Sequence, residues 1–169
     1  MPKKKPHVVF LDVDGTLISY DGIFPASAKE ALHLARKAGH QMVVCSGRSL
    51  CQIKTWFPME LTDGLVTAAG SSVYYQGQLI YSTTFEEEYT RKMVRYFEEN
   101  QMPFFLQSEE ALYSAKWCMA SEKALFQEKG LKADAVEEVF GTVEFVDRPW
   151  TKPGIEKALY YNCHKEAAQ

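Results

Sequence analysis

The sequence lacks the features that mark membrane, secreted and repeat proteins. No apolar run approaches the roughly 20 residues that a membrane-spanning helix needs, and the chain holds no internal repeat or low-complexity tract. The basic N-terminal residues are followed by the apolar run Val8–Leu11, which is far too short for the core of a signal peptide. We therefore expect a cytoplasmic protein with no membrane partner.

A large charge of one sign is also absent. The formal net charge is -3, from 19 Lys and Arg against 22 Asp and Glu. Such a surface exerts no strong field on a polyphosphate, so nucleic acid is not an expected partner. With 46% hydrophobic and 24% charged residues, the composition is that of a globular protein. A length of 169 residues predicts one domain, or one domain with a small second module.

Cysteine is scarce and its spacing indicates no metal site. The four cysteines, Cys45, Cys51, Cys118 and Cys163, form no C-x-x-C pair, which argues against zinc. A protein of this size needs no disulfide framework, so we expect reduced thiols in the cytoplasm. Because Cys45 stands in an apolar run, we expect it to be a buried small hydrophobic residue rather than a nucleophile.

Predicted strands and helices alternate in the first half of the chain. Apolar runs predict strands at residues 7–14, 41–45 and 65–69, the first of them buried on both faces. A capping-box signature at Ser27-x-x-Glu30 predicts the start of a helix that ends at Gly39, and a short helix is expected at 49–57. This alternation is typical of a doubly wound α/β domain, in which ligands bind at the carboxyl ends of the strands.

From residue 73 the pattern changes to antiparallel strands mixed with helices. Gln76-Gly77 between two short apolar runs is the signature of a β-hairpin. Beyond it we expect helices at 86–100, 121–129 and 154–168 and strands at 104–107, 112–118, 136–140 and 143–146. The sequence therefore predicts an α/β core over residues 1–81 and an α+β module over residues 82–169.

Polar residues follow the first two predicted strands. Asp12 and Asp14 point to the same side of an extended segment, and Gly15 permits a tight exit turn. Such carboxylates can hold Mg²⁺, which prefers hard oxygen ligands. One of them can also attack a phosphorus atom while the other transfers the proton. A polar turn after a core strand would place the same two residues there, so the pair by itself leaves both interpretations open.

The context of both strand ends is more specific. Residues 7–17, with Asp12-Val13-Asp14-Gly15-Thr16-Leu17 after an apolar strand, resemble motif I of the haloacid dehalogenase (HAD) superfamily. Ser46-Gly47-Arg48 resembles motif II in its S/T-G-R variant. The hairpin and the α+β module are similar to those of the Cof-type branch, which carries a C2 cap. The resemblance implies a phosphatase of small phosphorylated metabolites, such as sugar phosphates.

The same resemblance implies a role for each matched residue. Asp12 would be the nucleophile, forming an aspartyl-phosphate, and a ligand of Mg²⁺. Asp14 would be the general acid and base and would contribute its backbone carbonyl to the metal. The Ser46 hydroxyl and the Gly47 N–H would bind the phosphate, while Arg48 would reach the substrate or anchor the loop.

The chain departs from the family pattern after the third strand and near its end. Ala69-Gly70 stands where this branch often has Asn-Gly, and no G-D-x-x-N-D run supplies the acids of motif IV. The stretch Thr151-Lys152-Pro153-Gly154 faintly resembles motif III, but a solvated lysine in a cap helix is the preferred interpretation of Lys152. We therefore expect a truncated form or a core completed by another chain, with a homodimer formed through the exposed edge of the Asp12 strand. The alternative function is that of a catalytically impaired HAD-like protein that binds phosphometabolites or protein partners.

Overall fold

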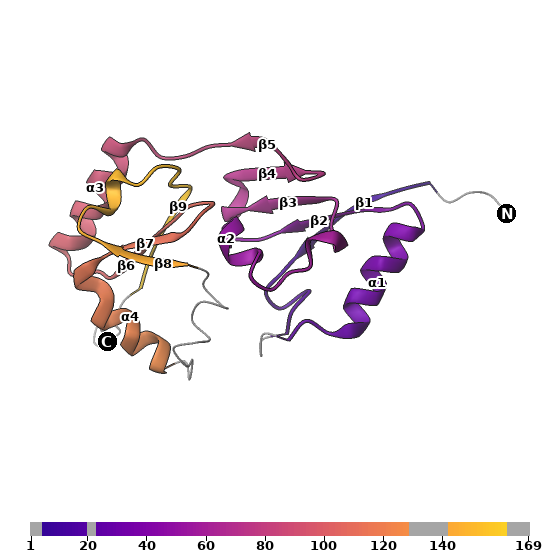
Figure 1. The fold of residues 1–169 in the computed structure, drawn as a ribbon, viewed down its shortest axis with the longest axis horizontal. Coiled ribbons are helices and arrows are strands. Elements are labelled where there is room, and N and C mark those ends of the chain that lie inside the picture. Colours follow the sequence, from indigo (N-terminus) through magenta and orange to yellow (C-terminus); the bar gives the residue numbers. More distant parts are fainter. Residues whose placement is uncertain (1–4, 20–22, 129–141, 162–169) are drawn as a thin grey trace, which may run out of the picture. The chain divides into compact units, whose positions relative to one another are not determined.

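The structure is a computed structural model that describes residues 5–19, 23–128 and 142–161 (Figure 1). The chain divides into two compact units. The first comprises Met1–Arg48 and Phe57–Ser82, and the second comprises Ser49–Trp56 and Thr83–Gln169. Residues 49–56 thus group with the later part of the chain, although they lie within the stretch that the sequence analysis assigned to the core.

The first unit is built on a five-stranded mixed sheet. In spatial order the strands are β1 (Val8–Asp12), β2 (Gln41–Cys45), β3 (Gly64–Thr67), β4 (Ser72–Tyr75) and β5 (Gln78–Ser82). β1, β2 and β3 are parallel, whereas β4 and β5 continue the sheet as an antiparallel hairpin. Because β1 and β2 run in the same direction with Asp12 opposite Cys45, the residues that follow them meet at one edge of the sheet.

Helix α1 (Ala26–Lys37) packs against β2 and buries Leu32. Its end at Gly39 is as predicted: Gly39 has a φ of 91°, and the N–H groups of Gly39 and His40 donate to carbonyls of the last turn. The predicted capping box at Ser27 is wrong. The N-cap is Pro25 and the helix begins at Ala26, two residues earlier than a cap at Ser27 would give, so Ser27 already lies inside the first turn.

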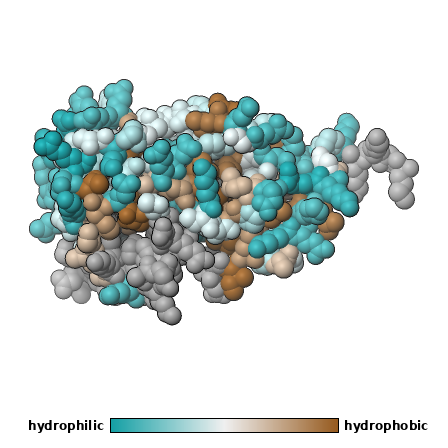
Figure 2. Space-filling model, in the orientation of Figure 1, coloured by the Kyte–Doolittle hydropathy of each residue, from teal (hydrophilic) through white to brown (hydrophobic). Residues whose placement is uncertain are grey.

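The prediction that the first strand is buried on both faces is also wrong. Val8 is 52% exposed and Phe10 is 65% exposed, whereas residues Met42–Val44 of β2 are buried. Among the described residues β1 pairs with β2 only, so β1 forms one edge of the sheet. An apolar sequence is buried only where other elements cover it. In Figure 2, brown hydrophobic residues appear in patches among the mostly teal hydrophilic residues of one face.

The second unit is built on a four-stranded sheet with the order β8 (Val143–Val146), β7 (Leu112–Ala115), β6 (Phe104–Gln107) and β9 (Lys157–Tyr160). Its helices are α2 (Leu50–Ile53), α3 (Glu87–Glu99) and α4 (Met119–Glu128). The core contains Val94, Phe97, Phe104, Leu106, Ala111, Tyr113, Ala115, Cys118 and Ile155. Within the described ranges, each helix is too short or too polar to cross a bilayer.

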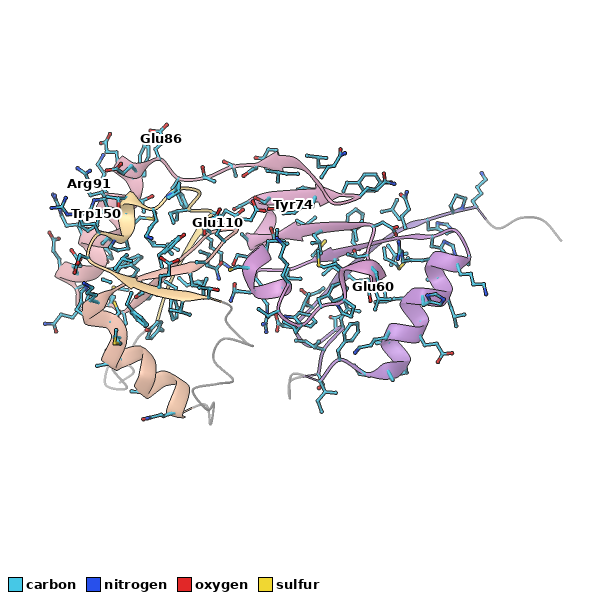
Figure 3. The ribbon with its side chains drawn as sticks, viewed as in Figure 1. Glu60, Tyr74, Glu86, Arg91, Glu110 and Trp150 are labelled. Carbon is cyan, nitrogen blue, oxygen red and sulfur yellow. The ribbon has the colours of Figure 1, made fainter. Side chains whose placement is uncertain are left out.

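Helix α3 faces this core with Val94 and Phe97, and Trp150 packs against the same cluster (Figure 3). Ion pairs one turn apart, Arg91 with Glu87 and Lys92 with Glu88, line its solvent side. A buried hydrogen bond explains why α2 groups with this unit. The Gln107 Nε2 atom donates to Gln52 Oε1 over 3.0 Å, and both side chains are buried.

The predicted terminal helix is wrong where the structure describes it. Residues 157–160 form β9, which pairs antiparallel with β6 along its whole length. Helix propensity amounts to a few tenths of a kcal/mol per residue, and the hydrogen bonds to β6 override it. The predicted strand at 136–140 and the residues from 162 onward lie outside the described residues.

Candidate active site

A tight turn around a buried carbonyl follows β1. Val13 is fully buried. Its backbone carbonyl oxygen accepts hydrogen bonds from the N–H groups of Thr16–Ile18 at 3.0–3.2 Å. Gly15 takes a φ of 80°, as the turn requires. Asp12 and Asp14, on either side of Val13, are exposed to solvent. The turn therefore buries the apolar residue of the motif and presents both carboxylates.

The loop after β2 is fastened to the end of β3 by backbone hydrogen bonds. The Ser46 N–H donates to the Val66 carbonyl at 2.8 Å, and the Ala69 N–H donates to the Ser46 carbonyl at 3.0 Å. The Ala68 N–H donates to the Arg48 carbonyl at 2.8 Å, and the Arg48 N–H donates to Ser46 Oγ at 3.1 Å. The loop at Ser46–Arg48 is thus held rigidly at the same sheet edge as the turn after β1.

The segment that holds this loop has a strained backbone. Ala68 and Ala69 have φ values of 49° and 60°, in the left-handed region that residues with a Cβ rarely adopt. Gly70 follows with a φ of 100°. Such conformations persist only where surrounding contacts enforce them, and they concentrate at functional sites. Here the contacts are the hydrogen bonds to Ser46 and Arg48.

A pocket of about 320 Å³ opens at this edge of the sheet. It is lined by Asp12, Cys45, Ser46, Gly47, Val66, Ala69 and Gly70. The structure therefore brings Asp12, Ser46 and Gly47 together, as the motifs predicted. Four further lining residues were not predicted to belong to the site: Cys45, Val66, Ala69 and Gly70. The available signal was their place at or next to the carboxyl ends of neighbouring parallel strands.

Asp14 and Arg48 are not among the residues that line this pocket, and they form an ion pair. The Arg48 Nη2 atom lies 2.7 Å from Asp14 Oδ1, and Arg48 Nε lies 3.1 Å from Asp14 Oδ2. The guanidinium therefore binds the carboxylate in a two-pronged, planar manner. This contact was not predicted, although opposite charges following two neighbouring parallel strands were a usable signal.

These features match a known family. The family model for haloacid dehalogenase-like hydrolases matches residues 9–153. The chain belongs to this family. Its α/β class, with a Rossmann-like core and an α+β module, is confirmed by HAD structures of the same fold. A haloacid dehalogenase-like hydrolase from Bacteroides thetaiotaomicron aligns with a TM-score of 0.75 at 16% identity, covering 94% of this chain and 59% of that one.

Other HAD relatives show the same partial overlap. A haloacid dehalogenase-like hydrolase from B. subtilis aligns with a TM-score of 0.72 at 17% identity, covering 96% of this chain and 63% of that one. In sequence, the chain is 25% identical over 107 residues to the 5-amino-6-(5-phospho-D-ribitylamino)uracil phosphatase YwtE of Bacillus subtilis. That match covers 63% of this chain and 37% of YwtE. The chain thus matches less than two thirds of the length of each of these relatives.

Cys45 of this HAD chain differs from its prediction in burial. It is only half-buried and lines the pocket. Burial and, to a smaller extent, the neighbouring Asp12 carboxylate raise the pKa of the Cys45 thiol. A raised pKa keeps the thiol protonated at neutral pH, which agrees with the prediction that Cys45 is not a nucleophile.

The residues at the pocket fit a hard divalent cation such as Mg²⁺. The exposed carboxylate of Asp12 is an oxygen donor that opens into the pocket. Within the described ranges, no group of three or more His, Cys, Asp and Glu side chains is arranged to hold a metal ion. Mg²⁺ does not need such a cage, because it commonly binds through one or two carboxylates, the substrate phosphate and several waters.

Proposed function

We propose that this chain is a Mg²⁺-dependent cytoplasmic phosphatase that acts on small phosphorylated metabolites, such as sugar phosphates, through an aspartyl-phosphate on Asp12. The observation that carries the proposal is the pocket that joins Asp12 to Ser46 and Gly47. The names of similar proteins support the substrate class. One similar structure is a sugar phosphatase of HAD subclass IIB, with a TM-score of 0.62 and 21% identity over 83% of this chain. YwtE is likewise named for a phosphorylated ribityl compound.

Phosphate binding falls to the loop at Ser46–Arg48. The Ser46 hydroxyl and the backbone of Gly47 border the pocket and supply hydrogen-bonding groups for phosphate oxygens. Backbone hydrogen bonds to Val66, Ala68 and Ala69 fix this loop, so it needs little reorganisation when a substrate binds. A rigid binding loop holds the phosphorus atom in line with the attacking carboxylate.

The reaction then has two steps. In the first, an Asp12 carboxylate oxygen forms a bond to phosphorus while the bond to the leaving oxygen breaks, and Asp14 donates a proton to that oxygen. In the second, water attacks the phosphorus of the aspartyl-phosphate. Asp14 takes the proton of this water, and the bond to Asp12 breaks. The products are the alcohol and inorganic phosphate, and both aspartates return to their starting state.

Asp12 and the backbone of Asp14 would hold the cation. Mg²⁺ at this position would screen the repulsion between the carboxylate and the phosphate and would stabilise the charge of the transition state. The experiment that tests the function is turnover of p-nitrophenyl phosphate with Mg²⁺ by the wild type and by Asp12→Asn. We expect the substitution to lower kcat by about a thousandfold or more, since a nucleophile cannot be replaced by an amide.

Asp147→Asn is the matched control, because Asp147 is an exposed aspartate that pairs with Lys116 in the second unit. It should leave turnover unchanged. Activity that survives in Asp12→Asn would refute the nucleophile assignment. Phosphate binding by a wild type that turns nothing over would favour the alternative, a catalytically impaired HAD-like protein that binds phosphometabolites.

We also propose that a second copy of the chain pairs with the free edge of β1. Within the described residues this edge is unpaired, and the adjoining Val8 and Phe10 side chains are largely exposed. An apolar edge strand offers both backbone hydrogen-bonding groups and hydrophobic surface to a like strand. Two identical edges related by a twofold axis satisfy each other, which favours a homodimer.

Light scattering at increasing concentration tests this pairing. We expect a dimer for the wild type and a monomer for Phe10→Asp, which places a charge on the edge. Phe85→Asp, which alters an exposed phenylalanine of the second unit, should remain dimeric. A wild type that stays monomeric at high concentration would rule the dimer out.

A further inference from the structure

The Arg48 guanidinium is in contact with a carboxylate that the proposed reaction needs to be free. Arg48 Nη2 lies 2.7 Å from Asp14 Oδ1 and Arg48 Nε lies 3.1 Å from Asp14 Oδ2. Both oxygens of the Asp14 carboxylate are therefore engaged by the guanidinium, and neither is free to contact a substrate. The structure therefore shows Asp14 in a resting arrangement.

The backbone of Arg48 is fixed, so the movable part of this contact is the side chain. The Arg48 N–H donates to Ser46 Oγ and the Arg48 carbonyl accepts from the Ala68 N–H, which fastens the residue to the edge of the pocket. The neighbouring residues Ser46 and Gly47 line the pocket itself. Because the backbone of Arg48 is held next to the pocket, a movement of its charge toward an anion bound there has to come from the side chain.

Asp14 and a bound phosphate differ in how strongly they attract the Arg48 guanidinium. The Asp14 side chain is 56% exposed, so water screens its attraction for Arg48. A bound phosphate offers two negative charges and three oxygens, and the planar guanidinium fork matches phosphate as well as carboxylate. A phosphate in the pocket therefore competes effectively for Arg48.

We propose that Arg48 is a positioning residue that holds Asp14 in the substrate-free protein and transfers to the phosphate when the substrate binds. This proposal rests on the proposed function. The exchange frees both oxygens of the Asp14 carboxylate from the guanidinium once a phosphate is bound. Without substrate, the ion pair holds the Asp14 side chain in place, with both of its oxygens bound to Arg48.

Binding of inorganic phosphate in the presence of Mg²⁺, measured by calorimetry on a double-mutant cycle, tests the exchange. Arg48→Gln should weaken phosphate binding by about tenfold, because a charged hydrogen-bonding partner is lost. Asp14→Asn should tighten it by about threefold or more, because Arg48 is then released without competition. In the Arg48→Gln background, Asp14→Asn should give a clearly smaller gain. Arg48→Lys, which keeps the charge but not the fork, should restore part of the affinity.

Arg36→Gln is the matched control, since Arg36 binds Asp63 of the same unit with a similar two-pronged contact. The Arg36→Gln substitution should leave phosphate affinity within about twofold of the wild type, because Arg36 is not among the residues that line the pocket. Urea denaturation of each variant shows that the folded state is retained.

The outcomes separate the two proposals. Saturable binding by the wild type with an equal Asp14→Asn gain in both backgrounds would overturn the exchange and leave the proposed function standing. An Arg48→Gln variant that binds phosphate as tightly as the wild type would do the same. Absence of saturable binding by the wild type would overturn the proposed function and the exchange together.

Discussion

Two arginine–aspartate pairs of the first unit have similar geometry but different surroundings. Arg36 binds both oxygens of Asp63 at 2.9–3.3 Å, and Asp63 Oδ2 also accepts the Met42 N–H at 2.8 Å. Burial by itself would raise the pKa of Asp63, but the hydrogen bonds from Arg36 and Met42 outweigh it and lower that pKa. The Asp63 side chain is 20% exposed, against 56% for Asp14. The Arg36–Asp63 pair therefore stabilises the fold, whereas the Arg48–Asp14 pair can exchange its carboxylate for another anion.

The largest expected effect comes from breaking the better-buried pair. Asp63→Asn removes the charge that Arg36 and the Met42 N–H bind, and we expect a loss of about 2–3 kcal/mol in the free energy of unfolding. Asp14→Asn should change it by less than about 0.5 kcal/mol, because exposed ion pairs contribute little. Urea denaturation of both variants measures the contrast. Equal losses would show that the two pairs do not differ as their surroundings indicate.

The contribution of Asp63 to the free energy of unfolding should also depend on pH. Because the pKa of Asp63 is lowered in the folded state, the contribution of this residue is complete above its unfolded pKa of about 3.9 and is lost as the pH falls through the lower, folded pKa. Unfolding free energies of the wild type and Asp63→Asn should therefore differ most at neutral pH and converge below about pH 4. A difference that stays constant down to pH 2 would contradict this assignment.

The smallest expected effect tests the backbone that supports Arg48. Ala69→Gly relieves a left-handed residue and should raise the free energy of unfolding by about 0.5 kcal/mol, after the entropy that glycine gains in the unfolded chain is subtracted. Ala31→Gly in α1 should lower it by about 1 kcal/mol, because that residue lies inside a helix. Thermal unfolding gives the sign of each change. Destabilisation by Ala69→Gly would show that the bend is unstrained.

Much of the secondary structure could be predicted because local residues decide it. The apolar run at 41–45 became β2 with the same bounds, and Gly39 ended α1. The hairpin turned at Gln76-Gly77, where both residues adopt a positive φ. The strand at 157–160 could not be predicted in this way, since its pairing partner, β6, lies some fifty residues earlier in the chain. The exposure of Phe10 likewise depends on which elements cover β1.

The candidate site was predictable in its residue types and less so in its contacts. Asp12, Ser46 and Gly47 were singled out by their place after two apolar strands, and they line one pocket. The ion pair between Asp14 and Arg48 was missed because these residues are 34 positions apart and meet only once β1 and β2 pair. The contribution of Ala69 was missed because alanine gives no sign that its backbone is left-handed.

The sequence by itself indicated the family and the order of the elements up to the hairpin at Gln76-Gly77, since apolar periodicity, glycine at turns and short motifs act over a few neighbouring residues. It also singled out Asp12, Ser46 and Gly47 as candidates for phosphoryl chemistry, and these residues line one pocket. Only the tertiary structure decided which strand edge stays exposed, which aspartate is paired with which arginine, and how deeply each pair is buried. Those features depend on groups that are distant in the chain and on how far water reaches them, and no local pattern of residues encodes either.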